Sequence, residues 1–373
     1  MKAILLLLLA ASAAAAQPAA HAYIGAGGCA SSNCHGGTTA LAAAESRVLG
    51  NEYATWSVSD KHARAAKALE EPHGKRIAQI LGITDASHDK RCAPCHVAGS
   101  PDKTRSDGVA CEACHGPAEA WLGPHTRQNS HEASVKAGMI DTKNLDTRAR
   151  TCLACHLGAR GQEVDHELIA AGHPDLAFEL DTFTAAQPAH HRPAAANLRQ
   201  RAWAVGEAVA LGQFLRLVQS HGDKPEFSDL ECYQCHHDLR SESWRLQRGY
   251  GARKPGAPQL DAARIEIVRL LAADERAAFD SGNLKTMERI ADQLAAKYQQ
   301  QDVDAAAVLR ALSANIQRIA DAGVHAAEQA TMTLDALGTK PDATAPLYTY
   351  LEHPSLYRPA EFVGLFQKAA AQQ

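Results

Sequence analysis

The feature that most constrains this chain of 373 residues is the arrangement of its ten cysteines. They form five pairs, and a histidine directly follows the second cysteine of every pair. Four pairs have the spacing Cys-x-x-Cys-His, and the first has the longer spacing Cys-x4-Cys-His. In chain order the motifs are Cys29/Cys34/His35, Cys92/Cys95/His96, Cys111/Cys114/His115, Cys152/Cys155/His156 and Cys232/Cys235/His236.

This spacing suits covalent attachment of haem. Two thiols add across the two vinyl groups of the macrocycle, and the next residue then lies under the iron, where histidine supplies the proximal imidazole. The chance that five independent positions all carry histidine is on the order of 10^-7. A zinc knuckle has no use for a histidine after each pair, and a disulfide framework makes no demand on histidine. The sequence therefore predicts five covalent haem c groups, with Ser31 to Asn33 forming a turn in the longer first motif.

The N-terminus has the pattern of an export signal. Lys2 precedes the apolar run Ala3 to Ala16, and Ala20-His21-Ala22 is a small-x-small cleavage site. We expect a signal peptide at residues 1–22 and a periplasmic mature protein; a cut after Ala16 and an uncleaved anchor are the alternatives. No later stretch has the roughly 18 consecutive apolar residues that a spanning helix needs, so no integral membrane segment is expected after signal removal.

The number of histidines in the chain indicates which residue type fills the sixth coordination position of each iron. Only three methionines remain after signal removal, too few for five irons, whereas thirteen histidines remain beyond the proximal ones and His21. Bis-histidine ligation is therefore the economical interpretation, and it predicts lower potentials than in Met/His cytochromes. The candidate distal ligands are His62, His125, His166, His173 and His237.

The surroundings of these histidines differ. His62 lies early in an expected helix that runs toward Leu69, whereas His237 follows a proximal histidine and could reach only a neighbouring haem. His166 and His173 would share one face of a helix, although Gly172 is expected to end that helix first. His325 lies in an Ala-rich helical pattern and is interpreted as a surface residue.

The expected fold class is mainly α, with little strand and with helices and loops wrapped around the haems. Residues 23–248 form the expected pentahaem domain, with one long helix at 197–219, and the Gly/Pro-rich residues 249–258 form a linker. Residues 259–373 have apolar residues at helical spacing and predict a C-terminal helical bundle with a tail. A further hypothesis is that this bundle is a platform for a homo-oligomer or a larger complex.

The composition and charge of the chain exclude some classes of function. The formal charge of -4 argues against nucleic-acid binding, and aromatic residues are only 5% of the chain, which is consistent with macrocycles that replace part of the side-chain core. No phosphate-binding glycine loop and no hydrolase constellation is present, so no catalytic residue is predicted.

Two sequence contexts resemble a known family. Cys111-Glu-Ala-Cys114-His115-Gly-Pro, together with Trp56 and His62-Ala-Arg-Ala upstream, is similar to the cytochrome c-554-type multihaem cytochromes. These belong to a wider group with hydroxylamine-oxidising and nitrite-reducing multihaem enzymes. Over residues 24–240 the resemblance implies helices around closely packed haem pairs, a periplasmic location and electron transfer. It also implies distal roles for His62, His125, His166 and His173.

The chain departs from that family in its five motifs, its longer first motif and its C-terminal helices. The pentahaem nitrite reductases have the same haem number, but they typically use a lysine in place of one proximal histidine, and here all five motifs end in histidine. The main hypothesis is an electron carrier between two redox partner proteins. The alternatives are an accessory haem subunit and a reductase or oxidase of a small nitrogen or sulfur species at one open iron, with His190, His191 and Arg192 as acid/base groups.

Overall fold

The computed structural model describes residues 21–43, 48–192, 195–224, 226–236 and 258–373. Residues 1–20 of the expected signal peptide, nearly all of the expected linker and the candidate ligand His237 lie outside the described residues. Among the described residues no strand forms, and the single isolated bridge joins Leu230 to Leu260. The expected mainly α fold class is confirmed.

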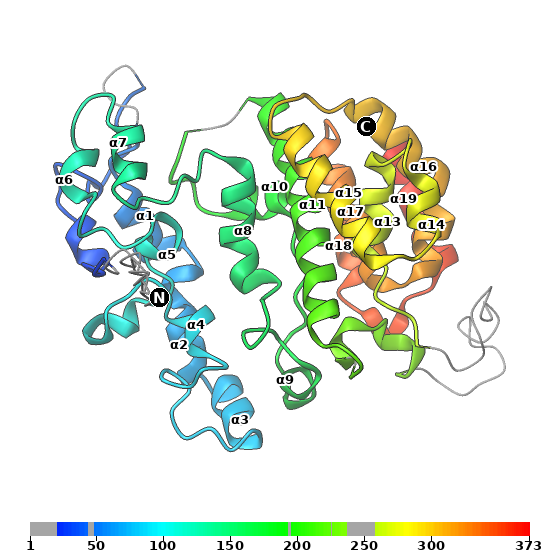
Figure 1. Cartoon of the computed structure of the whole chain (residues 1–373), viewed down its shortest axis with the longest axis horizontal. Coiled ribbons are helices and arrows are strands. Elements are labelled where there is room, and N and C mark those ends of the chain that lie inside the picture. The colour runs from blue at the N-terminus through cyan, green and yellow to red at the C-terminus, as the bar shows by residue number, and fades with distance from the viewer. Residues whose placement is uncertain (1–20, 44–47, 193–194, 225, 237–257) are drawn as a thin grey trace, which may run out of the picture.

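The N-terminal region consists of short helices separated by loops, on the left in Figure 1. Helices of this length are not stable alone, because the first turn costs backbone entropy that few hydrogen bonds offset, so other groups must hold them. They are α1 (Glu52–Ser59), α2 (Ala65–Glu70), α3 (Pro72–Ile80), α4 (Ala93–His96), α5 (Cys111–His115), α6 (Leu122–His125) and α7 (His131–Lys136), with 3-10 turns at Ala26–Cys29, His62–Arg64 and Asp102–Asp107.

The middle of the molecule is built around one long helix, α11 (Ala196–Ser220), which the sequence predicted within one residue at each end. Trp203 and Leu211 of α11 are fully buried, and α11 is apolar on most of its surface, as expected of a helix enclosed by others. Its neighbours in the chain are α8 (Leu145–His156), α9 (His166–Ala171) and α10 (Leu180–Ala186).

The C-terminal residues form a compact group of helices on the other side of α11, on the right in Figure 1. Asn283 and Asp304 accept hydrogen bonds from the first turns of α15 and α16, which explains where these helices begin. The group consists of α13 (Ala263–Leu271), α14 (Arg276–Asp280), α15 (Leu284–Tyr298), α16 (Ala305–Ala322), α17 (Val324–Leu337), α18 (Ala345–Leu351) and α19 (Pro359–Ala370), with 3-10 turns at Pro341–Thr344 and Pro354–Leu356. Two further 3-10 turns, at Phe227–Asp229 and Cys232–Gln234, lie between α11 and α13.

One apolar core contains residues from both sides of the expected linker. Leu145 of α8, Trp203 of α11, Ile290 of α15, Leu312 of α16 and Phe362 of α19 all belong to it, and each is at most 1% exposed. Burial of such side chains contributes on the order of 1.5–3 kcal/mol each to folding. The C-terminal helices therefore share their core with α8 and α11 of the haem-motif region.

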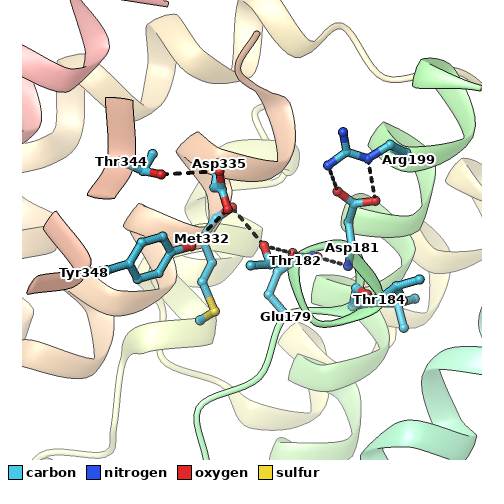
Figure 2. Close-up of polar contacts among 10 residues, drawn as sticks. Glu179, Asp181, Thr182, Thr184, Arg199, Met332, Asp335, Thr344 and Tyr348 are labelled. Atoms are coloured by element: carbon cyan, nitrogen blue, oxygen red, sulfur yellow. Dashed lines mark hydrogen bonds and ion pairs between the residues drawn. The ribbon is translucent and has the colours of Figure 1, made fainter. Parts of the chain in front are cut away.

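Polar contacts join α10 to the same C-terminal helices (Figure 2). The Thr182 hydroxyl donates to Glu179 at 2.6 Å and lies 3.5 Å from the carbonyl oxygen of Met332 on α17. On the other side of α10, Arg199 of α11 forms two hydrogen bonds to Asp181. α10 is thus fixed between α11 and α17, which orients the segment just before it, where Phe178 lies.

None of the helices in the described part of the chain is long and apolar enough to cross a membrane. Even α11, the longest of them, carries charged residues along its length, including Arg199, Glu207 and Arg216.

Candidate haem-binding sites

The standard motifs lie on short helical segments. α4, α5 and the last turn of α8 each end at the histidine of a motif, and the fifth motif forms the 3-10 turn Cys232–Gln234. Helical spacing brings residues three apart to the same face, so both thiols of a motif can face one macrocycle. None of the ten cysteines, which all lie in the described part of the chain, forms a disulfide.

The first motif is a hydrogen-bonded turn. The Cys34 and Gly36 amides both donate to the Ser31 carbonyl oxygen, at 2.9 and 3.0 Å. A Cβ at Gly36 would lie on the Ala30 carbonyl oxygen, so only glycine fits after His35. The two additional residues are therefore accommodated in this turn, as the sequence predicted.

Four of the five motif histidines lie opposite a second imidazole ring from a distant part of the chain. In each case the ring centroids are 6.1 to 6.3 Å apart. The pairs are His35 with His125, His96 with His173, His156 with His62 and His236 with His166.

This spacing fits a metal ion between two imidazoles. A ring nitrogen binds a transition metal at about 2 Å, which puts two ring centroids on opposite sides of one iron about 6.3 Å apart. Packed rings without a metal reach similar separations, since Tyr357 and Phe362 lie 6.1 Å apart, so the distance alone does not define an axial pair. What favours axial ligation is that each of the four pairs joins a motif histidine to a histidine from a distant segment at a separation compatible with an intervening iron.

Hydrogen bonds donated by Nδ1 orient several of these rings. His35 Nδ1 donates to Glu52 at 2.9 Å, His96 Nδ1 to the Ala65 carbonyl at 2.8 Å and His62 Nδ1 to Asp60 at 3.0 Å. His125 and His173 donate from Nδ1 to nearby carbonyl oxygens. Because Nδ1 is already bonded, Nε2 is the nitrogen that is left for a metal, as is usual for metal-binding histidines.

The third motif differs. Within the described residues, the His115 ring has no second imidazole in ring contact. Burial, followed by the influence of His190, His35 and His125, lowers the pKa of His115 to about 4, so the ring is neutral, as a ligand must be. His190 is the histidine with the largest effect on His115, and it lies in the segment between α10 and α11.

The motifs approach one another in pairs. A hydrogen bond from the Cys111 thiol of the third motif lowers the pKa of Cys29 of the first motif to about 7. A hydrogen bond from the Cys155 thiol of the fourth motif likewise lowers the pKa of Cys95 of the second motif to about 7. Burial, with a smaller effect of the nearby Cys114, raises the pKa of Cys152 to about 12. The third and fourth motifs are therefore also close.

The fifth motif borders a large cavity. Cys232, Cys235, His236 and His166 line a space of about 810 Å³ that is mostly apolar and includes residues of α13 and α17. This is the size of a ligand-binding pocket and suits a flat apolar macrocycle. The cavity is therefore formed jointly by the haem-motif region and the C-terminal helices.

His325 is one of the cavity residues, so its interpretation as a surface residue is wrong. Its ring contacts Asp175 and Asp261, and its side chain is 23% exposed. Although burial acts to lower the pKa of His325, the two carboxylates raise it well above its ordinary value. Helical periodicity could not show this, because both partners come from distant segments.

The structure thus brings four of the predicted distal candidates to motif histidines: His62, His125, His166 and His173. α9 ends at Gly172, which has a left-handed φ of 114°, so His166 and His173 point to different motifs. Sequence reasoning assigned His190 only to a possible acid/base pocket. No local pattern marks its proximity to His115, because it lies outside any helix.

Comparisons with known proteins concern part of this region. Residues 29–116 match the family model described as cytochrome c554 and c-prime. The chain is 32% identical over 120 residues to a cytochrome c-554 of Nitrosomonas europaea, a match that covers 27% of this chain and 50% of that protein. The chain thus matches about half the length of that relative, and no solved structure matches it. These matches show that part of the chain, residues 29–116, is similar to the cytochrome c-554 family, and this likeness is consistent with the repeated haem-attachment motifs.

Proposed function

We propose that this protein is a periplasmic pentahaem cytochrome that transfers electrons between two redox partner proteins through bis-histidine haems. The observation that carries the proposal is the set of four imidazole pairs at 6.1 to 6.3 Å, each joining a motif histidine to a histidine from another segment. Haem c bound at these sites supplies a one-electron Fe(III)/Fe(II) couple.

The chain's own residues favour transfer over bond chemistry at four sites. A histidine on each side of an iron leaves no position for a substrate, so these residues hold the metal and exclude other ligands. Glu52 and the Ala65 carbonyl fix the proximal rings of the first two motifs, which limits rearrangement when the charge of the site changes.

Contacts between motifs support a continuous series of haems. The pairs Cys29/Cys111 and Cys95/Cys155 join the first motif to the third and the second to the fourth. The fourth motif approaches the fifth site through Phe178. The ring of Phe178 stacks on His156, and its carbonyl oxygen accepts a hydrogen bond from Arg264, which lines the fifth cavity.

The haem count tests the proposal. The mature protein, produced with the bacterial system for covalent haem attachment, should give five haems per chain in a pyridine haemochrome assay, and its intact mass should include five haems. Two or three haems per chain, or thiols found as disulfides or zinc ligands, would contradict the five-site assignment.

A second function is favoured by the third motif alone. Because His115 has no ring partner among the described residues, its iron is the one position where a small nitrogen or sulfur species could bind, with His190 nearby as an acid/base group. Carbon monoxide added to the reduced protein separates the two functions. An unperturbed spectrum supports the carrier, whereas binding at one haem in five supports a reductase or oxidase.

A further inference from the structure

We propose that His325, held between Asp175 and Asp261, is a positioning residue of the fifth haem site that closes the cavity wall beside Cys232 and sets the charge next to that haem. This inference rests on the proposed function, because it requires haem attachment at the fifth motif. It assigns a role to the C-terminal helices, which lie outside the region that matches the cytochrome c-554 family.

The position of His325 is defined by two short contacts. Nε2 lies 2.8 Å from Asp175, and Nδ1 lies 2.6 Å from Asp261. With both ring nitrogens engaged by carboxylates, the ring is held as an imidazolium and cannot itself act as an axial ligand. One donor atom each from His325, Asp175 and Cys232 lies within 4.8 Å of the others, so this charge adjoins the attachment thiol.

The two carboxylates come from segments that shape the haem sites. Asp175 lies two residues after His173, which faces His96 of the second motif. Asp261 lies next to the Leu230–Leu260 bridge, and its amide donates to the Asp229 carbonyl oxygen at 2.9 Å. His325 therefore connects α17 to both of these segments.

The segment around Asp261 also holds the fifth motif directly. Gln234, inside the motif, donates from its side chain to the Gln259 carbonyl oxygen at 2.9 Å and accepts from the Gln259 amide at 2.7 Å. The Glu231 amide donates to the same carbonyl oxygen at 3.0 Å. A displacement of this segment would therefore move the residues that attach the haem.

The contact between α17 and the motif is close. Gly323 precedes α17 with a φ of 136°, and a Cβ added there would lie 3.2 Å from the Glu231 side chain. The start of α17 thus lies against the residue that precedes Cys232. Arg264 and Gln329 add polar groups from α13 and α17 to the same cavity, so the C-terminal helices form a wall of the fifth site.

The charges of these side chains predict the direction in which each replacement shifts the reduction potential of the fifth haem. A positive charge beside a haem disfavours the ferric state, and a negative charge favours it. Replacing His325 with glutamine leaves Asp175 and Asp261 facing the fifth site without their cation, which lowers its potential. Replacing Asp261 with asparagine removes one negative charge and keeps the side-chain oxygen that accepts from the Ala263 amide, which raises the potential.

The test is a potentiometric titration of the holoprotein at one pH, comparing wild type with His325→Gln, Asp261→Asn and the double variant. At a fixed electrode potential, the oxidised-to-reduced ratio of one haem should change about tenfold, which is 59 mV for one electron. The change should have opposite signs in the two single variants and should largely cancel in the double variant. The matched control is His88→Gln, which breaks an exposed His–Asp pair in which both side chains are 59% exposed.

The inference would be overturned if all five reduction potentials were unchanged in both single variants. It would also be overturned if the potential of one haem shifted in the same direction in both variants, because a general loosening of the fold would have that effect. If His325→Gln does not retain the fifth haem, the potential measured for Asp261→Asn tests the inference, because asparagine has nearly the size and shape of aspartate. A wild-type protein with only four haems would instead contradict the proposed function, and that is known before any variant is made.

Discussion

His35 and His125 face one another with ring centroids 6.3 Å apart and ring planes inclined by only 15°. The rings of His166 and His236 are inclined by 31°, whereas the pairs His62/His156 and His96/His173 are nearly perpendicular, at 86° and 89°. The four pairs thus share one separation but fall into two orientations.

These orientations predict two classes of low-spin signal in the electron paramagnetic resonance spectrum of the ferric protein. Near-parallel imidazole planes split the two iron d orbitals that interact with them and give a rhombic spectrum, whereas perpendicular planes leave these orbitals nearly equal in energy and give one large g value. Among the four haems of the imidazole pairs, we expect two with each type of signal. Four haems of a single class would contradict the ring geometry.

The His115 site predicts a specific effect of His190. If His190 provides the sixth ligand there, His190→Ala should convert one haem in five from low spin to high spin and allow carbon monoxide to bind it after reduction. His353→Ala is the control, because His353 is exposed in the C-terminal region. Identical spectra for His190→Ala and wild type would exclude His190 as the ligand.

Gly172 links two haem sites through the backbone. Helix α9 begins with His166 and is terminated by Gly172, which has a left-handed φ of 114°. His173 directly follows Gly172. Gly172→Ala should cost about 1–2 kcal/mol of folding free energy and should perturb the spectra of two haems. Gly282→Ala is the matched control, because its φ is also positive, at 67°, and an added Cβ would meet no atom within 4 Å.

In that control, stability should fall by a similar amount while all haem spectra remain unchanged. Denaturant unfolding followed by circular dichroism measures the first quantity, and absorption spectra of the oxidised protein measure the second. Altered haem spectra in Gly282→Ala, or unaltered spectra in Gly172→Ala, would contradict the role assigned to the end of α9.

Glu207 predicts how stability depends on pH. Burial within the core raises its pKa from 4.5 to about 7, although Arg264 and a hydrogen bond from Gln329 act in the opposite direction. Because the folded state keeps the proton that the unfolded state releases, the contribution of Glu207 to stability is greatest below pH 4.5 and is lost as the pH rises to about 7. The loss is on the order of 1–3 kcal/mol.

Glu207→Gln removes this titration, so its free energy of unfolding should change less between pH 5 and pH 8 than that of wild type. Guanidinium titrations at the two pH values measure the difference. Glu352→Gln, at an exposed position after α18, should leave the wild-type profile unchanged. An equally steep profile in Glu207→Gln would show that Glu207 does not titrate in this range.

The sequence predicted the local features of this molecule well. The motif positions, the turn in the first motif and α11 follow from spacing and periodicity over short stretches of chain. His62, His125, His166 and His173 could be proposed as ligands from the surplus of histidine and the family resemblance.

Features that depend on distant segments could not be predicted in this way. Nothing near His325 indicates that Asp175 and Asp261 approach it, and nothing near His190 indicates that it lies by His115. The same holds for the core shared by α11 and the C-terminal helices, because amphipathic patterns show that a helix is buried but not what covers it.

The most direct test of the account is an experimental structure of the holoprotein that resolves the axial ligands of each iron. It should place one iron between the rings of each pair: His35 and His125, His62 and His156, His96 and His173, and His166 and His236. Irons bound to other sixth ligands, or motif cysteines without a haem, would contradict the central claim.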